Sequence, residues 1–338
     1  MRATFLHAPG DVRVADAPMP TIQRPTDAVV RVSATCVCGS DLWSYRGISP
    51  VDGPKRIGHE YCGVVVEVGS DVRCVQAGQF VVGPFFSCDN TCPHCRAGFQ
   101  SACDELEWYV GCQAEFVRVP NADGTLVATP GEPPAELVAS LLACSDVFGT
   151  GWHAARMAGV QAGMTVAVVG DGAVGLCGVI AAGQLGADRI IAMSRHATRQ
   201  RLARDFGATD IVADRGDAGV EHVQDLTGGI GADAVLECVG TGSAMEQAIG
   251  CARPGAIVGF VGVPHGVELP VRHMYAHNVG VRGGVAAVRE YLPHLIELVW
   301  SGAVEPGRVF DLSLPLELAA AGYAAMDRRE AIKALLRP

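Results

Sequence analysis

The sequence predicts an α/β protein that combines a β-rich domain with a doubly wound parallel sheet. In its first part, short valine-rich segments bounded by Gly, Pro or Asp recur, and no long helical pattern precedes residue 135. From Met164 onward, strand patterns alternate with helical patterns, which is typical of βαβ units around a parallel sheet. A glycine-rich turn follows the first strand of this alternation and indicates a nucleotide-binding domain.

Three segments of the first part have the composition of strands: Ala28–Val32, Gly63–Val68 and Phe80–Val82. The pattern changes after Pro133, where apolar residues at helical spacing predict a helix over Ala135–Cys144. The alternation that follows predicts strands at Val166–Val169, Arg189–Met193, Ile211–Val212, Ala234–Val239 and Ala256–Val261, and helices at Ala173–Leu185, Thr198–Phe206, Val220–Leu226 and Ser243–Cys251.

The alternation stops at about Gly283, and a single amphipathic helix is predicted over Val288–Trp300. A chain of 338 residues is long enough for two domains, each with its own core. We therefore expect a nucleotide-binding domain over residues 150–284, between the β-rich residues 1–149 and the tail 285–338.

Composition excludes several classes of protein. Hydrophobic residues make up 49% of the chain and charged residues 18%, which favours a folded core over disorder. The net charge of −10 argues against a nucleic-acid or anionic-membrane partner. Apolar stretches are interrupted well before the ~20 residues that a bilayer helix needs. The chain opens MRATFLHAPG, without an apolar signal segment, so we expect a cytoplasmic protein with reduced thiols.

Four cysteines lie close together: Cys88, Cys92, Cys95 and Cys103. The C-x-x-C pair at Cys92 and Cys95 can hold one ion, because thiolates with this spacing reach the ~2.3 Å Zn–S distance. Cys88 and Cys103 complete a tetrahedron in this interpretation. The cluster predicts a closed zinc site rather than a disulfide framework, which is typical of short secreted chains. His94 lies inside the loop, but its neighbours already supply four thiolates.

The glycine-rich turn has the pattern G-x-G-x-x-G after a predicted strand and before a predicted helix, which is the context of a dinucleotide site. The first glycine permits a tight turn, the second lets the backbone approach a pyrophosphate, and the third allows close packing of helix and strand. The pyrophosphate then rests on the free N–H groups of the helix N-terminus. The residues assigned to this turn are Gly170, Gly172, Ala173, Val174 and Gly175.

A second set of metal donors lies upstream of the cysteine loop. A catalytic zinc needs three protein ligands and one open position, and Cys38 in C-G-S-D and His59 in G-H-E supply two. These motifs, with the cysteine loop and the glycine turn in this order, resemble the zinc-dependent medium-chain alcohol dehydrogenases over essentially the whole chain. The resemblance implies a β-rich GroES-like catalytic domain made of residues 1–149 and 285–338, and a Rossmann domain, residues 150–284, inserted between these two segments. It also implies two zinc ions per chain, and a homodimer or homotetramer.

The resemblance places the third ligand just before a T-G-x stretch, where Asp146 stands. Cys144 competes, because residues two apart on a helix point about 200° apart and only one can face the metal; the motif offset favours Asp146. The family also implies that Glu60 reaches the metal when water leaves. Asp41 is expected to hold His59 and fix its tautomer.

The chain departs from the family pattern at two places. The family's loop reads C-x2-C-x2-C-x7-C, whereas three residues separate Cys88 from Cys92 here, which makes Cys88 the least certain ligand. A family histidine three residues after Ser40 is replaced by Trp43, so Ser40 must pass its proton through ribose or water. Trp43 and Phe86 are expected to wall the substrate pocket, ahead of the weaker candidates Tyr45 and Trp108. Alternatively, these aromatic residues only pack a core.

The resemblance implies reversible hydride transfer between a nicotinamide cofactor and an alcohol, aldehyde or ketone, with Ser40 carrying the hydroxyl proton. A polyol or threonine dehydrogenase of the same superfamily would use nearly identical motifs. A zinc- and nucleotide-binding regulatory protein without activity is a third interpretation, which the intact set of donors disfavours.

The cofactor is expected to be NADP(H) rather than NAD(H). NAD-specific domains place Asp or Glu at the end of the second strand, about 20 residues beyond the glycine turn. In this chain the strand runs into Ser194 and Arg195, with Arg199 further along, and no carboxylate follows it. A hydroxyl and a guanidinium at this place can bind a 2′-phosphate.

Overall fold

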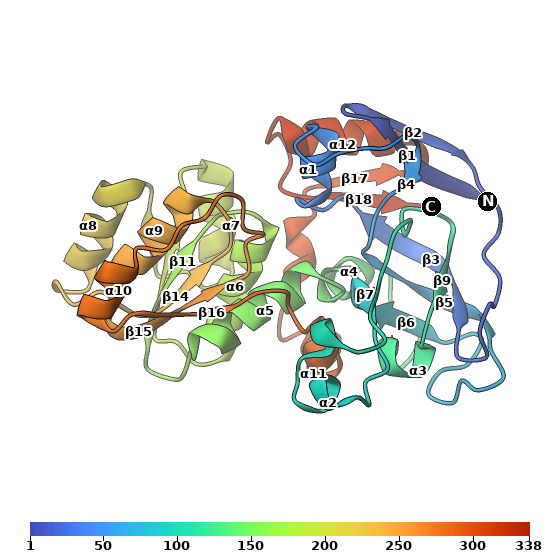
Figure 1. Ribbon diagram of the computed structural model, residues 1–338, viewed down its shortest axis with the longest axis horizontal. Helices are drawn as coiled ribbons and strands as arrows, with labels where there is room; N and C mark the ends of the chain where they lie inside the picture. The colour runs from blue at the N-terminus through green and yellow to red at the C-terminus, as the bar shows by residue number, and fades with distance from the viewer. The chain divides into compact units, whose positions relative to one another are not determined.

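The computed structural model describes residues 1–338, which form two compact units (Figure 1). One unit comprises Met1–Asp146 together with Ala287–Pro338, and the other comprises Val147–Ala286. The first unit is rich in antiparallel strands and the second has one parallel sheet, so the α/β fold class is confirmed.

The first unit contains a three-stranded sheet in the order β2-β1-β4, a seven-stranded sheet, and a two-stranded sheet of β7 and β8. In the seven-stranded sheet, β10-β6-β5-β3-β18-β17 are neighbours in this order and β9 also pairs with β3. The strands are β1 Arg2–Ala8, β2 Asp11–Asp16, β3 Ala28–Cys36, β4 Lys55–Arg56, β5 Tyr61–Val68, β6 Phe80–Gly83, β7 Phe86–Ser87, β8 Glu107–Trp108, β9 Phe116–Val119, β10 Val127–Ala128, β17 Leu312–Pro315 and β18 Ala334–Arg337.

The central strand β3 connects distant parts of this unit. Buried valines of β3 pack with those of β5, β6 and β9 in one hydrophobic cluster. The C-terminal strand β18 pairs antiparallel with β3, with Leu335 opposite Cys36. The sequence did not predict β18, because four residues carry no periodic signal. The helices are α1 Asp41–Tyr45, α2 Pro93–Arg96, α3 Ala122–Thr125, α4 Val138–Cys144, α11 Val288–Trp300 and α12 Ala319–Asp327, with 3₁₀ turns at Gln100–Ala102, Pro306–Val309 and Leu316–Leu318.

The second unit is a parallel sheet in the order β13-β12-β11-β14-β15-β16. The order reverses at β11, and sheets of this kind bind ligands beyond the carboxyl ends of the strands at such a switch point. The strands are β11 Thr165–Val169, β12 Arg189–Met193, β13 Asp210–Val212, β14 Ala232–Glu237, β15 Ala252–Phe260 and β16 Gly280–Gly283. The helices are α5 Val147–Ala158, α6 Ala173–Gln184, α7 Ala197–Asp205, α8 Gly216–Leu226, α9 Gly242–Cys251 and α10 Val271–His277.

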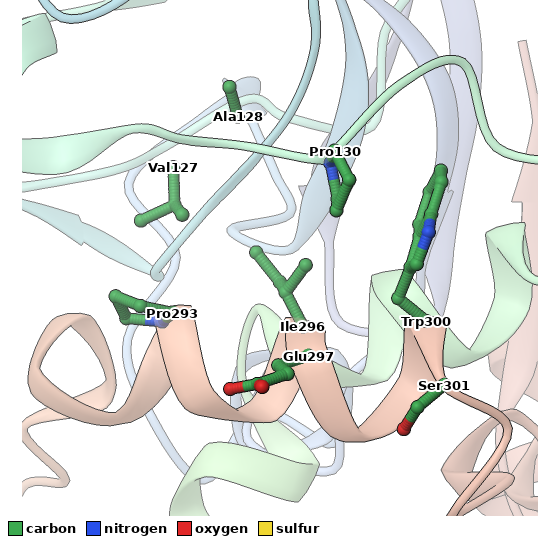
Figure 2. Close-up of a pocket in the computed structure, with 8 residues that line it drawn as sticks. All are labelled: Val127, Ala128, Pro130, Pro293, Ile296, Glu297, Trp300 and Ser301. Carbon is green, nitrogen blue, oxygen red and sulfur yellow. The ribbon is translucent and has the colours of Figure 1, made fainter.

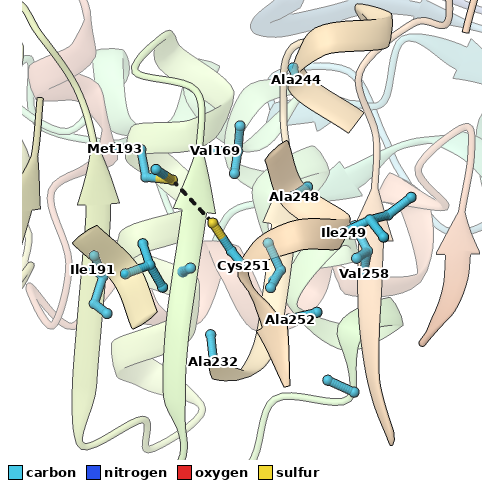
Figure 3. Close-up of a cluster of buried hydrophobic side chains, with 14 of the residues drawn as sticks. Val169, Ile191, Met193, Ala232, Ala244, Ala248, Ile249, Cys251, Ala252 and Val258 are labelled. Carbon is cyan, nitrogen blue, oxygen red and sulfur yellow. Dashed lines mark hydrogen bonds between the residues drawn. The ribbon is translucent and has the colours of Figure 1, made fainter. Parts of the chain in front are cut away.

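The core of the second unit lies between the sheet and α9 (Figure 3). Apolar residues of β11, β12, β14 and β15 face the buried side of α9, and the sulfurs of Met193 and Cys251 lie 3.9 Å apart. Their burial explains why the strands and helices predicted for this region recur in the structure, with bounds that differ by up to four residues, as in α8 and β15.

Helix α5 is the main element that the sequence did not predict. Two glycines in Val147-Phe-Gly-Thr-Gly lower its intrinsic helix propensity. A Cβ on Gly151 would lie 2.6 Å from the backbone nitrogen of Gly178 in α6, so glycine permits the close packing of these helices. Packing therefore stabilises a helix that propensity alone disfavours.

Two surface features complete the description. An apolar groove lies where α11 faces β10, and it contains none of the predicted site residues (Figure 2). No helix combines the length and the apolar character that crossing a membrane requires.

Candidate active site and metal centres

Four donor side chains of the first unit converge on one point. The ligand atoms of Cys38, His59, Glu60 and Asp146 all lie within 4.8 Å of one another. Cys38 follows β3, His59 and Glu60 precede β5, and Asp146 lies between α4 and α5. The Asp146 carboxylate is 3.6 Å from the Cys38 sulfur and 3.3 Å from His59 Nε2. A thiol, an imidazole and a carboxylate in this arrangement fit a tetrahedral zinc with an open position.

The choice between Asp146 and Cys144 has a geometric answer. Asp146 contacts both other donors, as described above, whereas the Cys144 thiol donates to the carbonyl oxygen of Ser140 at 3.3 Å. Cys144 is fully buried inside α4. The structure therefore brings Asp146, and not Cys144, to the donor cluster.

Asp41 lies behind His59. Its Oδ1 is 3.5 Å from His59 Nδ1, so His59 Nε2 is left to face the cluster. Asp41 also accepts a hydrogen bond from the Cys38 backbone N–H at 3.0 Å, which ties the turn of Cys38 to the same carboxylate. Burial works against ionisation of Asp41, but the positive charge of His59 outweighs it and lowers the pKa of Asp41. The contact fixes the orientation of the imidazole.

Glu60 is held by Lys333, a residue that the sequence did not single out. The Lys333 ammonium lies 2.7 Å from Glu60 Oε1 and donates to the Val37 carbonyl at 3.2 Å, and both ionic side chains are almost completely buried. Burial lowers the pKa of Lys333, but the surrounding acidic groups raise it well above its usual range. Glu60 Oε2 has no hydrogen-bond partner. Lys333 and Glu60 are 273 positions apart, so no sequence motif connects them. The pairing of β18 with β3 brings Lys333 to this site.

Ser40 and Trp43 lie at the start of α1. Ser40 is the exposed residue before the helix, and its hydroxyl makes no capping bond. Trp43 is half-buried in the same helix, near Tyr45, whose ring packs on Tyr323 5.5 Å away. The Ser40 side chain is therefore at the surface, whereas Tyr45 packs against α12.

Phe86 is predicted to wall the substrate pocket, but its side chain is fully buried. Phe86 begins β7 and packs against Cys88, Cys95 and Cys103. Its neighbour Phe85, and not Phe86, contacts the His59 ring.

Phe85, which directly precedes β7, and Trp108 of β8 stack on each other. Phe85 meets the His59 ring edge-on at 6.2 Å and stacks on Trp108 at 6.1 Å with an interplanar angle of 11°. Trp108 is 53% exposed. A continuous aromatic surface therefore leads from a donor of the candidate catalytic centre to solvent. The two adjacent phenylalanines in the sequence gave no indication of which one faces outward.

The second donor cluster differs from the predicted one by one residue. It consists of Asp89, Cys92, Cys95 and Cys103, whose ligand atoms lie within 4.8 Å of one another. The Cys88 thiol instead lies 3.2 Å from the carbonyl oxygen of Gly124. Asp89 restores the spacing x2-x2-x7, so the carboxylate occupies the first position and Cys88 lies one residue too early.

Backbone N–H groups support this second cluster. Cys103 Sγ accepts from the N–H groups of Asp89 and Glu105, each at 3.3 Å, and Cys92 Sγ accepts from Cys95 N–H at 3.5 Å. Asp89 Oδ1 accepts from Cys92 N–H at 3.1 Å. His94 is directed toward Asp104 and not toward the cluster. Three sulfurs and one carboxylate oxygen fit a closed zinc site.

The glycine turn has the geometry that a dinucleotide requires. Gly170 has a φ of +116°, and a Cβ on Gly175 would lie 2.0 Å from the Gly170 carbonyl oxygen, so neither position accepts a side chain. Nothing lies within 4 Å of a Cβ built on Gly172, and no side chain caps α6. The N-terminus of this helix, where Ala173 and Val174 follow, is free to receive a pyrophosphate.

The residues predicted to bind a 2′-phosphate lie beside this turn. Ser194 is buried and its hydroxyl donates to Asp171 Oδ2 at 2.8 Å. Arg199 pairs with Asp171 Oδ1 at 3.4 Å. Arg195 is exposed and its side chain makes no hydrogen bond or ion pair. Asp171, which the sequence reasoning did not weigh, thus contacts two of the three.

Comparison with known proteins agrees with these two halves. A model of the alcohol dehydrogenase GroES-like domain matches residues 24–131, and a model of the zinc-binding dehydrogenase domain matches residues 173–301. The chain is 36% identical over 351 residues to zinc-type alcohol dehydrogenase B of Aspergillus flavus, which covers 100% of this chain and 81% of that protein. An alcohol dehydrogenase from Thermus sp. has a TM-score of 0.92 at 34% identity, covering 100% of this chain and 99% of its own. A zinc-binding dehydrogenase from Sinorhizobium meliloti bound to NADP has a TM-score of 0.83 at 28% identity, with 100% and 99% covered.

Proposed function

The chain belongs to the zinc-dependent medium-chain alcohol dehydrogenase family, and on this basis we propose that it transfers a hydride reversibly between NADP(H) and an alcohol, aldehyde or ketone. Alcohol dehydrogenase activity follows from the family. The observation that carries the proposal is the convergence of Cys38, His59 and Asp146, with Asp41 behind the imidazole.

Two zinc ions per chain are proposed, one on Cys38, His59 and Asp146 and one on Asp89, Cys92, Cys95 and Cys103. When bound, the first zinc supplies a Lewis acid that stabilises negative charge on the substrate oxygen, and the nicotinamide exchanges the hydride. Cys38, His59 and Asp146 hold this metal. Ser40 carries the hydroxyl proton.

The cofactor preference is proposed to be NADP(H) over NAD(H). Its support is the exposed, unpaired guanidinium of Arg195 beside Ser194, and the absence of a carboxylate after β12. The NADP in the relative from Sinorhizobium meliloti agrees with it.

The substrate is proposed to be an aromatic or extended apolar alcohol or its carbonyl partner. Phe85 and Trp108 offer a flat apolar surface beside His59, on which a planar group can stack with an energy of about 0.5–1.5 kcal/mol beyond its burial. Trp43 is proposed to contribute to the same wall. The hydroxyl groups of a polyol substrate would find no hydrogen-bond partner on this apolar surface.

The oligomer is proposed to be a homodimer or homotetramer, as the family resemblance implies. The cytoplasm is proposed as the compartment, which agrees with the thirteen cysteines all being free.

The test of the proposed function is a panel of aliphatic, aromatic and polyol alcohols, assayed with NADP⁺ and NAD⁺, with and without a chelator. Asp146→Ala should lose activity and the catalytic zinc, whereas Cys144→Ala should keep both. Metal analysis should give about two zinc ions per chain. No turnover of any alcohol by zinc-loaded protein would contradict the proposal, and the reverse pattern at the two positions would make Cys144 the ligand.

A further inference from the structure

We infer that Asp171, the second residue of the glycine motif, is a cofactor-specificity residue that opposes binding of a 2′-phosphate and favours the free 2′-hydroxyl of NAD(H). This inference rests on the proposed nicotinamide-dependent function. It goes beyond that proposal, because it limits the NADP(H) preference expected from Arg195 and makes the chain able to use both cofactors.

The position of Asp171 follows from the register of two neighbouring parallel strands. Val169, at the end of β11, lies opposite Met193, at the end of β12. Asp171 comes two residues after the first strand, and Ser194 comes directly after the second. Both therefore lie at the carboxyl edge of the sheet, where dinucleotides bind in this fold.

The contacts of Asp171 occupy the groups that a 2′-phosphate needs. Ser194 donates to one carboxylate oxygen at 2.8 Å, and Arg199 lies 3.4 Å from the other. Arg199 also donates to the Asp171 carbonyl oxygen at 3.3 Å. The side chains of Asp171 and Arg199 are 12% and 13% exposed, so the pair is largely shielded from water and its charges compensate each other. Arg195 remains as the uncompensated cation.

A phosphate and a hydroxyl therefore meet different surroundings at this place. A serine hydroxyl has one proton, and Ser194 already gives it to Asp171, so a 2′-phosphate must displace a carboxylate to receive it. Two anionic groups held close together in a shielded site also repel each other. A ribose 2′-hydroxyl, by contrast, can donate to the carboxylate, which is the contact that an acidic residue after the second strand makes in NAD-specific domains. Here the glycine turn supplies the carboxylate.

The experiment measures binding of 2′,5′-ADP and 5′-AMP, which differ by the 2′-phosphate, by titration calorimetry on the full chain. Asp171→Asn should tighten 2′,5′-ADP by about tenfold or more and leave 5′-AMP unchanged or weaker. The ratio of kcat/KM for NADPH over NADH should rise by a similar factor. Asp188→Asn is the matched control, because it makes the same charge change at the amino end of β12, on an exposed side chain.

Arg199→Gln in the Asp171→Asn background should remove a large part of the gain, since the freed guanidinium is its source. Asp171→Ser is a second variant, which keeps a hydrogen-bond acceptor for Ser194, and melting temperatures show that each variant is folded. Unchanged or weaker 2′,5′-ADP binding in both Asp171 variants overturns the inference. The wild-type cofactor ratio is a separate result: a wild type that favours NADH contradicts the proposed NADP(H) preference, while tighter 2′,5′-ADP binding by Asp171→Asn still supports the role of Asp171.

Discussion

The two metal-donor clusters are built in opposite ways. In the cysteine loop, all four donors lie between Asp89 and Cys103, and the sulfurs accept hydrogen bonds from the loop's own backbone N–H groups. In the other cluster, Cys38 and Asp146 are 108 residues apart. That cluster also contains Glu60, a buried carboxylate held by Lys333. A local, closed set of donors stabilises the loop that carries it, whereas a set assembled from distant segments can keep one position open for chemistry.

The comparison predicts its largest effect on activity. Cys38→Ser or His59→Ala removes a donor from the open cluster, and kcat/KM for the best alcohol should fall at least about 1000-fold, because Lewis-acid assistance contributes several kcal/mol. The melting temperature should change little, since other contacts hold β3 and β5. Steady-state assays, metal analysis and thermal unfolding check this. Full activity in Cys38→Ser protein would show that this cluster is not the catalytic centre.

The next largest effect concerns the buried ion pair between Lys333 and Glu60. Lys333→Met leaves Glu60 buried without its cation, and the free energy of unfolding should fall by roughly 3 kcal/mol. The double variant Lys333→Met/Glu60→Gln should recover a large part of this loss, because no unpaired charge remains. Chemical denaturation measures both. If the single variant is as stable as the wild type, the ion pair does not hold Glu60.

A smaller effect separates Asp89 from Cys88. Asp89→Ala should weaken zinc binding by the loop about 30-fold, which reduces the stabilisation by bound zinc by about 2 kcal/mol. Cys88→Ala is the matched control one residue away, and it should keep two zinc ions per chain. Metal analysis after dialysis against a mild chelator distinguishes them. Zinc loss in Cys88→Ala but not in Asp89→Ala would restore the four-cysteine site.

The fold class and the role of Asp146 were predicted from different features of the sequence. Strand and helix periodicity predicted the parallel sheet, because its strands are buried and regular. Asp146 came from its offset to a motif, which agrees with its place in the donor cluster. Asp89 was not predicted because the adjacent Cys88 is the more typical zinc ligand. Only the backbone conformation decides which of the two side chains faces the other three donors.

Other residues lay outside what sequence patterns can show. Lys333 directly precedes β18 and Glu60 directly precedes β5, and both strands pair with β3, which no local pattern encodes. Phe85 directly precedes β7 and Phe86 begins it, so the pairing of β7 with β8 decides which of the two rings is buried. The glycine pattern allows any residue at the position of Asp171, so it does not indicate a role for this side chain.

The smallest predicted effect tests whether the aromatic stack beside His59 contacts the substrate. Trp108 is exposed and stacked on Phe85, which itself meets His59, whereas the aromatic residue at the closed cluster, Phe86, is fully buried. If the outward stack contacts the substrate, Trp108→Ala should raise KM for an aromatic alcohol about tenfold, because a stacked ring pair and its burial together contribute on the order of 1.4 kcal/mol. KM for a short aliphatic alcohol should stay the same, since such a molecule is too small to cover the indole. Trp300→Ala is the matched control, as Trp300 lines the groove of Figure 2, whose lining includes no donor residue. An equal rise of KM for both alcohols would mean that Trp108 stabilises the pairing of β7 with β8 and does not contact the substrate.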